Sequence, residues 1–553
     1  MDPEPNLQID DSFLVAQCNE HGLATIKPSD SNASVPKTQF ALAYTGLLFA
    51  VFLYYLDSTI ISPAFPFILA DLGKETLLPW LGLYMLTSAP FGILYGKFST
   101  VFPKKYVFLF ALTVFLIGSM ICAVAQSMEV LIFGRALAGV GGGGFLPLSF
   151  IIIADMTTLQ DRSKYNSILG SAMGLGSILG PLLGGTFSDR LNWRWCFWIN
   201  IPIGLISFAF IMTNLKISTT QENVLAKLRN VDVLGALTLL ITLLAFNIPI
   251  LLGGTTWAWD SAQVITLFVL SVLGGLVFLW IEFRVASDPI IPPAIFKVRW
   301  ITASIALSFC MGAVMNSYLF YFSLLLEFIF EFSAVKTGEI NVISCGTYVV
   351  FTVVSGAILA KRGHYISFFI VGPILWAISI IWVANFTKDT DMGQIVGSLL
   401  FLGTAGGLMI TTRISAMQLH VPTHFLPICQ GIVSCCFAVG ANVAISITGT
   451  ILNNLLVIKT NDSAELHTAI DMLIKEGFQV TVSQYITLAK TFQKLLQSSG
   501  SEETLFSAAL IQLKSGWNDA FKYAYMSNLA YLVGILLLVP VIWPKRKEAK
   551  NEA

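Results

Sequence analysis

Charged side chains are scarce in this chain of 553 residues. Lys, Arg, Asp and Glu together make up 12% of it, whereas 55% of its residues are hydrophobic. A soluble domain carries about 25% charged residues, so the composition excludes an ordinary soluble protein and indicates a chain that crosses a membrane many times. The formal net charge is zero, which provides no electrostatic basis for binding nucleic acid.

The chain also lacks the patterns of metal, disulfide and nucleotide sites. Its eight cysteines show no Cys-x-x-Cys spacing and its five histidines show no metal-ligand spacing. No Gly-x-x-x-x-Gly-Lys-Ser/Thr loop is present, so we do not expect ATP to drive it directly. The glycine run at 141–144 lies inside a predicted membrane helix, where close packing explains it. We therefore predict a protein that is not an enzyme and has neither a cofactor nor a metal.

Long apolar runs dominate what is present. A spanning helix needs about 20 apolar residues, and this rule predicts about fourteen spans. They lie near 40–68, 79–98, 104–125, 128–153, 165–188, 194–213, 231–253, 261–283, 300–326, 337–360, 365–386, 392–416, 426–457 and 523–543.

Lysine and arginine predict the orientation of these spans. Nineteen of them fall on the side of the N-terminus and five in the opposite short loops, so both termini should be cytosolic. The polar residues 1–39 lack the apolar core of a cleaved signal peptide and should form a disordered cytosolic tail. The sequons at Asn385 and Asn461 both fall outside and are candidate glycosylation sites.

The helix predicted at 165–188 is rich in glycine. Small residues such as Gly174, Gly180 and Gly184 let two helices approach closely in lipid. Pro181 removes a backbone donor and bends a helix. A tight, bendable helix contact predicts a moving part.

These residues also carry a resemblance. Residues 176–185 resemble the Gly-Pro-x-x-Gly-Gly signature of exporters in the major facilitator superfamily. Residues 193–204 and 56–66 are similar to elements of its fourteen-helix drug:proton antiporter subfamily. Arg135, with Gly139 and Gly141, resembles the fourth-helix Arg-x-x-x-Gly-x-Gly motif. The resemblance implies a gating role for Gly174, Gly180, Pro181, Gly184 and Gly185.

The implied fold is all-α, with two six-helix bundles plus two extra helices. A faint repeat supports it, because basic residues follow both the second and the tenth predicted helix. The predicted parts are a tail at 1–39, a bundle at 40–213, a linker with two inserted helices at 214–299, a bundle at 300–543 with a long extracellular loop at 458–522, and a cytosolic tail at 544–553. In such parallel repeats the binding site lies between the halves at mid-depth.

An ionisable group within a span costs at least a few kcal/mol, and two such groups stand out. Asp57 lies about 17 residues into the first helix and Arg135 about 7 residues into the antiparallel fourth, so they reach comparable depth. We interpret Asp57 as the proton-coupling or cation-binding carboxylate. Arg135 is the positive charge that lowers the cost of keeping Asp57 ionised. The alternatives are a structural salt bridge, or an Asp57 at the outer water interface.

A second group of charges lies at the cytosolic helix ends. The superfamily pattern implies a charge network there, with Asp155 and Arg162 beside the loop after the second helix. That loop departs from the pattern, because Thr100 replaces its acidic residue and Pro103 its glycine. The alternative is that the basic residues only anchor the topology. The candidates for the network are Lys97, Lys104, Lys105, Asp155 and Arg162.

Polar and aromatic side chains inside the spans are candidates for a cavity. Tyr54, Tyr84, Asn316 and Tyr318 could line a polyspecific site, although aromatic residues in membrane helices more often pack or face lipid. Arg413 lies near the cytosolic end of its predicted helix, where we expect it to reach the headgroups as an anchor.

Together these features predict a monomeric exporter in the lipid bilayer. It would exchange protons for small amphipathic or apolar drugs, toxins or secondary metabolites by alternating access. The sequence around Thr100 and at 193–198 resembles that of fungal members of the family. This resemblance implies the plasma membrane or, alternatively, the vacuolar membrane. The alternative function is a proton-coupled importer, for example of iron chelates (siderophores).

Overall fold

The computed structural model describes residues 36–73, 75–215, 232–253, 257–286, 288–362, 365–422, 425–461 and 503–542. Within these residues the protein is helical and has no β-strand. Thirteen of the described helices are long and apolar enough to cross a membrane. The fold is therefore an all-α membrane bundle, as predicted.

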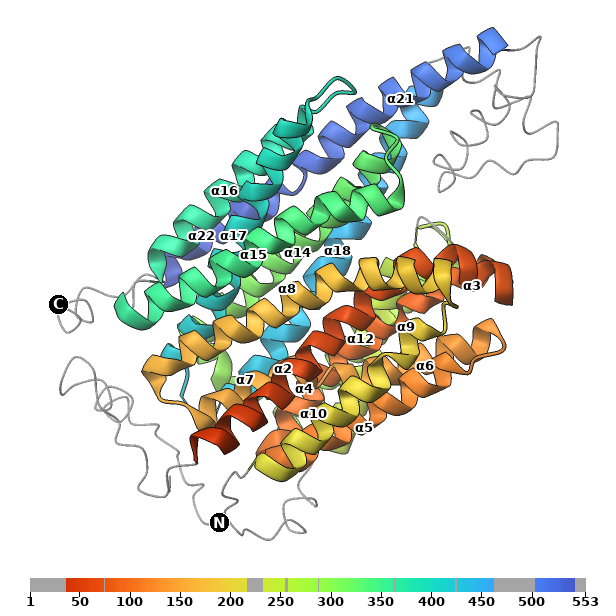
Figure 1. The fold of residues 1–553 in the computed structure, drawn as a ribbon. Coiled ribbons are helices and arrows are strands. Elements are labelled where there is room, and N and C mark those ends of the chain that lie inside the picture. The colour runs from red at the N-terminus through yellow and green to blue at the C-terminus, as the bar shows by residue number, and fades with distance from the viewer. Residues whose placement is uncertain are drawn as a thin grey trace.

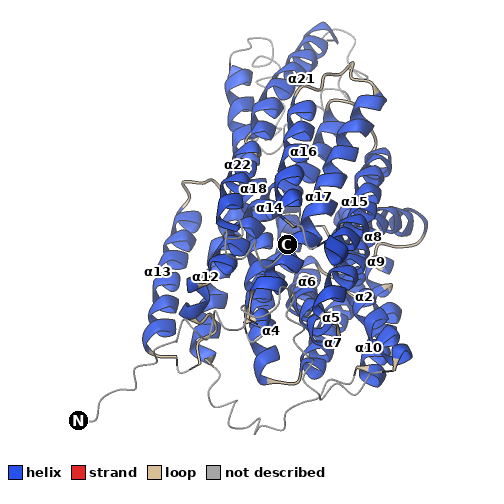
Figure 2. Ribbon diagram, turned by 90° about the vertical axis from the view of Figure 1, so that its left-hand side faces the viewer, coloured by secondary structure: helices blue, strands red, loops and turns tan. Residues whose placement is uncertain are grey.

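The helices run up and down in two halves joined by a helix pair (Figures 1 and 2). The first half contains α2 (Lys37–Ile60), α3 (Phe65–Leu72), α4 (Leu83–Val101), α5 (Lys104–Ala123), α6 (Met128–Gly142), α7 (Phe145–Met156), α8 (Leu159–Arg190), α9 (Trp195–Trp198) and α10 (Asn200–Asn214). The connecting pair is α12 (Val233–Leu252) and α13 (Ala262–Arg284). The second half contains α14 (Arg299–Phe328), α15 (Ala334–Arg362), α16 (Ile366–Ala384), α17 (Met392–His420), α18 (Leu426–Asn461), α21 (Glu503–Met526) and α22 (Leu529–Ile542).

Helix α4 corresponds to the span predicted at 79–98, but it is not among the thirteen apolar helices. Its polar residues include Thr87, Ser88 and Lys97, and all three are buried. α4 packs against α6 and α18, so much of its surface faces protein rather than lipid. A helix surrounded by other helices does not need the apolar surface that hydropathy detects.

The loop predicted at 458–522 is shorter than expected. α18 continues to Asn461 and α21 already begins at Glu503, while 462–502 lie outside the described residues. α21 buries Trp517 and Tyr525 in the core of the second half, although charged residues such as Lys514 and Lys522 interrupt its hydropathy. The prediction placed the start of α21 too late, because an amphipathic helix resembles a loop in a hydropathy profile.

The two halves contact each other at the end of the bundle where α2 begins, here called the Lys37 end. Asn166 Nδ2 of α8 donates a hydrogen bond to Gln418 Oε1 of α17 at 2.8 Å. Gln418 Nε2 donates in turn to the carbonyl oxygen of Phe150 at 3.4 Å. A Cβ added at Gly96 of α4 would lie 2.6 Å from the carbonyl oxygen of Pro427, at the start of α18. The helices of the two halves thus pack backbone to backbone at this end.

Candidate functional site

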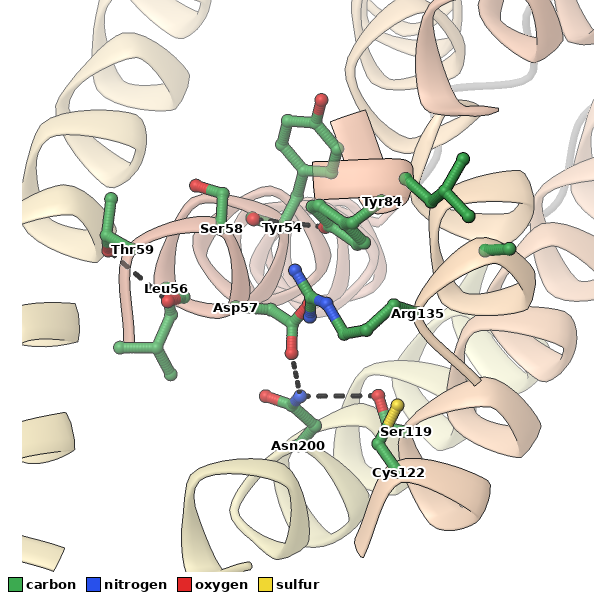
Figure 3. Close-up of polar contacts among 12 residues, drawn as sticks. Tyr54, Leu56, Asp57, Ser58, Thr59, Tyr84, Ser119, Cys122, Arg135 and Asn200 are labelled. Atoms are coloured by element: carbon green, nitrogen blue, oxygen red, sulfur yellow. Dashed lines mark hydrogen bonds and ion pairs between the residues drawn. The ribbon is translucent and has the colours of Figure 1, made fainter. Parts of the chain in front are cut away.

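The centre of the first half holds a buried carboxylate, that of Asp57. It lies near the end of α2, and its exposed fraction is 0%. It accepts hydrogen bonds from Arg135 Nη1 at 2.5 Å and from Asn200 Nδ2 at 2.7 Å (Figure 3). The structure therefore brings Asp57 and Arg135 together as a buried ion pair, and it places Asp57 away from the water interface. The guanidinium and the amide supply the hydrogen bonds that a buried carboxylate needs.

Arg135 reaches this position from α6. The helix starts at an N-cap, where Ser127 Oγ accepts a hydrogen bond from the backbone N–H of Val130. The guanidinium carbon lies 4.2 Å from the centroid of the Tyr84 ring and 5.8 Å from that of Phe197. Such cation–π contacts help a charged group to tolerate a site without water. Arg135 itself is 2% exposed, and its Nε has no hydrogen-bond partner within the described structure.

Asn200, at the start of α10, is the third member of the cluster. Besides Asp57, its amide reaches Ser119 Oγ of α5 at 3.3 Å. An asparagine in a membrane helix needs a hydrogen-bond partner, and Asn200 has two. The sequence alone does not identify Asp57 and Ser119 as these partners, because they lie on helices far apart in the chain.

The glycines of α8 lie directly beside this cluster. A Cβ added at Gly180 would lie 1.9 Å from Thr59 Oγ1, and one at Gly184 would lie 2.1 Å from the carbonyl oxygen of Ile60. Both contacts are with α2, next to Asp57. Gly174 faces α15 instead: a Cβ added there would lie 2.6 Å from the side chain of Val349. α8 therefore touches the carboxylate helix on one face and the second half on another.

The remaining members of the predicted gating motif are less constrained. A Cβ added at Gly185 would find its nearest neighbour, Pro63, at 3.9 Å. Pro181 lies within α8, which remains a continuous helix from Leu159 to Arg190.

The charges predicted to form a network at the Lys37 end are joined only in part. Lys104 forms an ion pair with Asp155. Lys105 Nζ instead donates to the carbonyl oxygen of Met212 at 2.6 Å, and Arg162 Nη2 donates to that of Ala154 at 2.7 Å. Lys97 is directed elsewhere: its Nζ lies 2.6 Å from Asp288 Oδ1 and 2.9 Å from the carbonyl oxygen of Pro289. It therefore ties α4 to the segment after α13.

The predicted cavity residues separate into two groups. Tyr84 lies under Arg135, and its hydroxyl donates to the carbonyl oxygen of Tyr54 at 3.1 Å, so both belong to the Asp57 cluster. Tyr318 is 0% exposed, and its hydroxyl lies 2.7 Å from Ser379 Oγ inside the second half. Tyr318 is thus packed within the second half in this conformation, and its role in lining a cavity stays a prediction. Asn316 Nδ2 donates within its own helix, to the carbonyl oxygen of Gly312 at 3.1 Å.

Arg413 does not reach the headgroups. It is 3% exposed, and its Nη1 donates to Ser308 Oγ of α14 at 2.6 Å. The prediction of a snorkelling anchor is wrong, because position along a helix determines depth but not the direction of the side chain. Sequence analysis missed Arg413 as a buried cation.

The two sequons lie at the end of the bundle opposite the Lys37 end. Asn385 follows α16 and is exposed, and Asn461 is the last residue of α18. Both sequons therefore lie at the same end of the bundle, and the predicted topology has both on one side of the membrane.

Comparison with known proteins identifies relatives over most of the chain. The family model described as Major Facilitator Superfamily matches residues 47–445. The chain is 31% identical over 424 residues to the MFS-type efflux pump MFS1 of Trichophyton rubrum, covering 76% of this chain and 79% of that protein. It is also 31% identical over 405 residues to efflux pump aflT of Aspergillus parasiticus, covering 72% and 79%.

A solved structure shows the same fold. The proton:xylose symporter XylE superposes with a TM-score of 0.57 over 92% of this chain and 96% of its own, at 14% identity. At this identity the likeness concerns the fold alone.

Proposed function

This chain belongs to the major facilitator superfamily, and from that premise we propose that it exports small amphipathic or apolar molecules in exchange for protons. It is a membrane transporter rather than an enzyme. The proposed direction rests on two relatives that match more than two thirds of its length and are named efflux pumps, MFS1 of Trichophyton rubrum and aflT of Aspergillus parasiticus. The substrates we propose are drugs, toxins or secondary metabolites.

The observation that carries the proton coupling is the burial of Asp57. Among the described residues it is the one carboxylate with an exposed fraction of 0%. Its two hydrogen bonds come from Arg135 and Asn200, so protonation changes the interactions of three helices at once. A proton that neutralises Asp57 removes the electrostatic attraction to Arg135 and weakens the hydrogen bond between them. The cluster then holds one net positive charge, whereas the ionised form is neutral.

The change at Asp57 has a direct route to the contact between the halves. α2 packs on α8 through Gly180 and Gly184, and α8 packs on α15 through Gly174. A shift of α2 relative to Arg135 would therefore move α8, the helix of the first half that contacts α15 of the second. We propose that these glycines are the sliding surface of the alternating-access motion.

The described conformation closes the Lys37 end. Hydrogen bonds and glycine contacts join the halves there. Since the excess of Lys and Arg at this end favours the cytosol, we propose that these contacts close the cytosolic side. We propose the plasma membrane as the location, with both termini cytosolic and the sequons Asn385 and Asn461 outside.

The decisive experiment is efflux of several dyes and antifungals from transporter-deficient cells, with and without a protonophore. We expect protonophore-sensitive efflux by the wild-type chain and its loss in Asp57→Asn. Asp71→Asn is the matched control, since Asp71 forms an exposed ion pair with Arg194 at 2.7 Å and is 47% exposed at its side chain.

The outcomes separate the parts of the proposal. Sensitive efflux that survives Asp57→Asn would keep the exporter but assign Asp57 a structural role. Accumulation of substrate by well-expressed wild-type protein would overturn export and favour the importer. Equal loss in Asp71→Asn would show that the effect is not specific to the buried carboxylate.

A further inference from the structure

The second half contains a buried guanidinium with few partners, that of Arg413 in α17. Its Nη1 donates one hydrogen bond, to Ser308 Oγ at 2.6 Å, and its guanidinium carbon lies 5.3 Å from the centroid of the Phe437 ring. Its Nε is buried without a hydrogen-bond partner. Within the described parts of the chain, no ion pair joins Arg413 to a carboxylate.

The first half shows what a compensated arginine looks like in this fold. There, Arg135 extends from the fourth span of its half to Asp57 on the first span. Arg413 likewise extends from the fourth span of its half to the first, α14, but it meets the hydroxyl of Ser308. A charged side chain inside a membrane bundle costs at least a few kcal/mol unless it is paired. The second half therefore presents an arginine whose counter-charge the described chain does not supply.

The surroundings of Arg413 are polar, aromatic and shared between the halves. Tyr55 on α2, Tyr348 on α15 and Cys436 on α18 lie close enough to Arg413 to interact with it electrostatically. Tyr348 is buried, and its hydroxyl has no hydrogen-bond partner in the described structure. Its ring fills the space beside Gly174 of α8, where an added Cβ would lie 3.0 Å away. Movement of the first half against the second would therefore open or close this site.

We propose that Arg413, with Tyr348 and Tyr55, binds a carboxylate group of the transported molecule, so that the substrates include amphipathic organic acids. A guanidinium has five N–H donors in a planar fork that matches a carboxylate. Nε is free to donate, and the hydroxyl of Tyr348 supplies a further donor. Phe437 and the tyrosine rings offer apolar contact to the rest of the molecule. The inference rests on the proposed function in taking the ligand to be the transported substrate.

The test uses two probes of the same shape and different charge, 1-naphthoate and 1-naphthamide. Binding of each to the purified full-length protein in nanodiscs is measured by quenching of tryptophan fluorescence, without any transport step. We expect wild-type protein to prefer naphthoate. Arg413→Gln should weaken naphthoate binding by about tenfold, the scale of one charge-assisted contact, and leave naphthamide binding unchanged. Arg413→Lys should restore part of the preference.

Two further variants make the result specific. Tyr348→Phe, which retains the charge and the ring, should weaken naphthoate binding by about threefold. Arg284→Gln removes an exposed arginine at the end of α13 and should leave both affinities unchanged. If Arg413→Gln does not yield folded protein, the wild-type preference and Tyr348→Phe decide the question.

Equal binding of the two probes by wild-type protein would overturn the inference, as would an equal loss in Arg284→Gln or an unchanged affinity in Tyr348→Phe. Dye efflux is read separately. Protonophore-sensitive efflux of the cation ethidium by Arg413→Gln would leave the proposed function standing even where the carboxylate site fails. If the wild-type chain shows no efflux but prefers naphthoate, the carboxylate site stands and the proposed function fails.

Discussion

The buried pair of Asp57 and Arg135 predicts a strongly non-additive effect on stability. The pair is joined at 2.5 Å, and its side chains are 0% and 2% exposed. Removing one partner of such a pair typically costs about 3–5 kcal/mol, because the other charge remains buried, whereas removing both charges is often far less costly. We expect Arg135→Gln to cost about 4 kcal/mol, since it leaves a buried carboxylate and also loses the contact with the Tyr84 ring.

Asp57→Asn should cost less, about 2–3 kcal/mol, because an amide oxygen can still accept from Arg135 and Asn200. The double variant should cost about 3 kcal/mol rather than the sum of the single effects, which corresponds to a coupling energy of about 3 kcal/mol. The assay is denaturant unfolding of purified protein in mixed micelles, followed by tryptophan fluorescence. Additivity within about 0.5 kcal/mol would refute the reasoning, because it would mean that the two groups do not interact as charges in the folded protein.

Two more predictions test the contacts around this pair. Gly184→Ala should abolish efflux and lower the melting temperature, because its Cβ would lie 2.1 Å from the carbonyl oxygen of Ile60. Gly185→Ala is the control and should behave as wild type in the same two assays, since the nearest atom to its Cβ would be 3.9 Å away. Equal effects of the two substitutions would argue against a close α2–α8 contact. Tyr84→Phe should cost about 1 kcal/mol for the hydrogen bond to the Tyr54 carbonyl oxygen, and Tyr84→Leu about 1–2 kcal/mol more for the lost ring under Arg135. Unfolding measurements that rank Leu above Phe in stability would contradict that role of the ring.

Fold class and helix order were predictable from hydropathy. A span that faces lipid must be long and apolar, so most spans leave a readable run in the chain. Depth was predictable as well, since the rise per residue is constant. This is why Asp57 and Arg135 could be expected at the same level before their contact was known. The glycine spacing in α8 likewise predicted close helix packing.

The direction of each side chain around its helix depended on the tertiary structure. Arg413 and Tyr318 lie at depths that the sequence specifies, yet the packing of α14, α16 and α17 turns both into the bundle. α4 has low hydropathy because polar side chains there bond to neighbouring helices, as Thr87 does to the carbonyl oxygen of Ala136. The start of α21 was placed too late because charged residues such as Lys514 and Lys522 interrupt its hydropathy. The partners of Asn200 and the isolation of Arg413 arise from contacts between residues distant in the chain. Such contacts exist only once the helices have packed together, and the groups that we propose as functional lie among them.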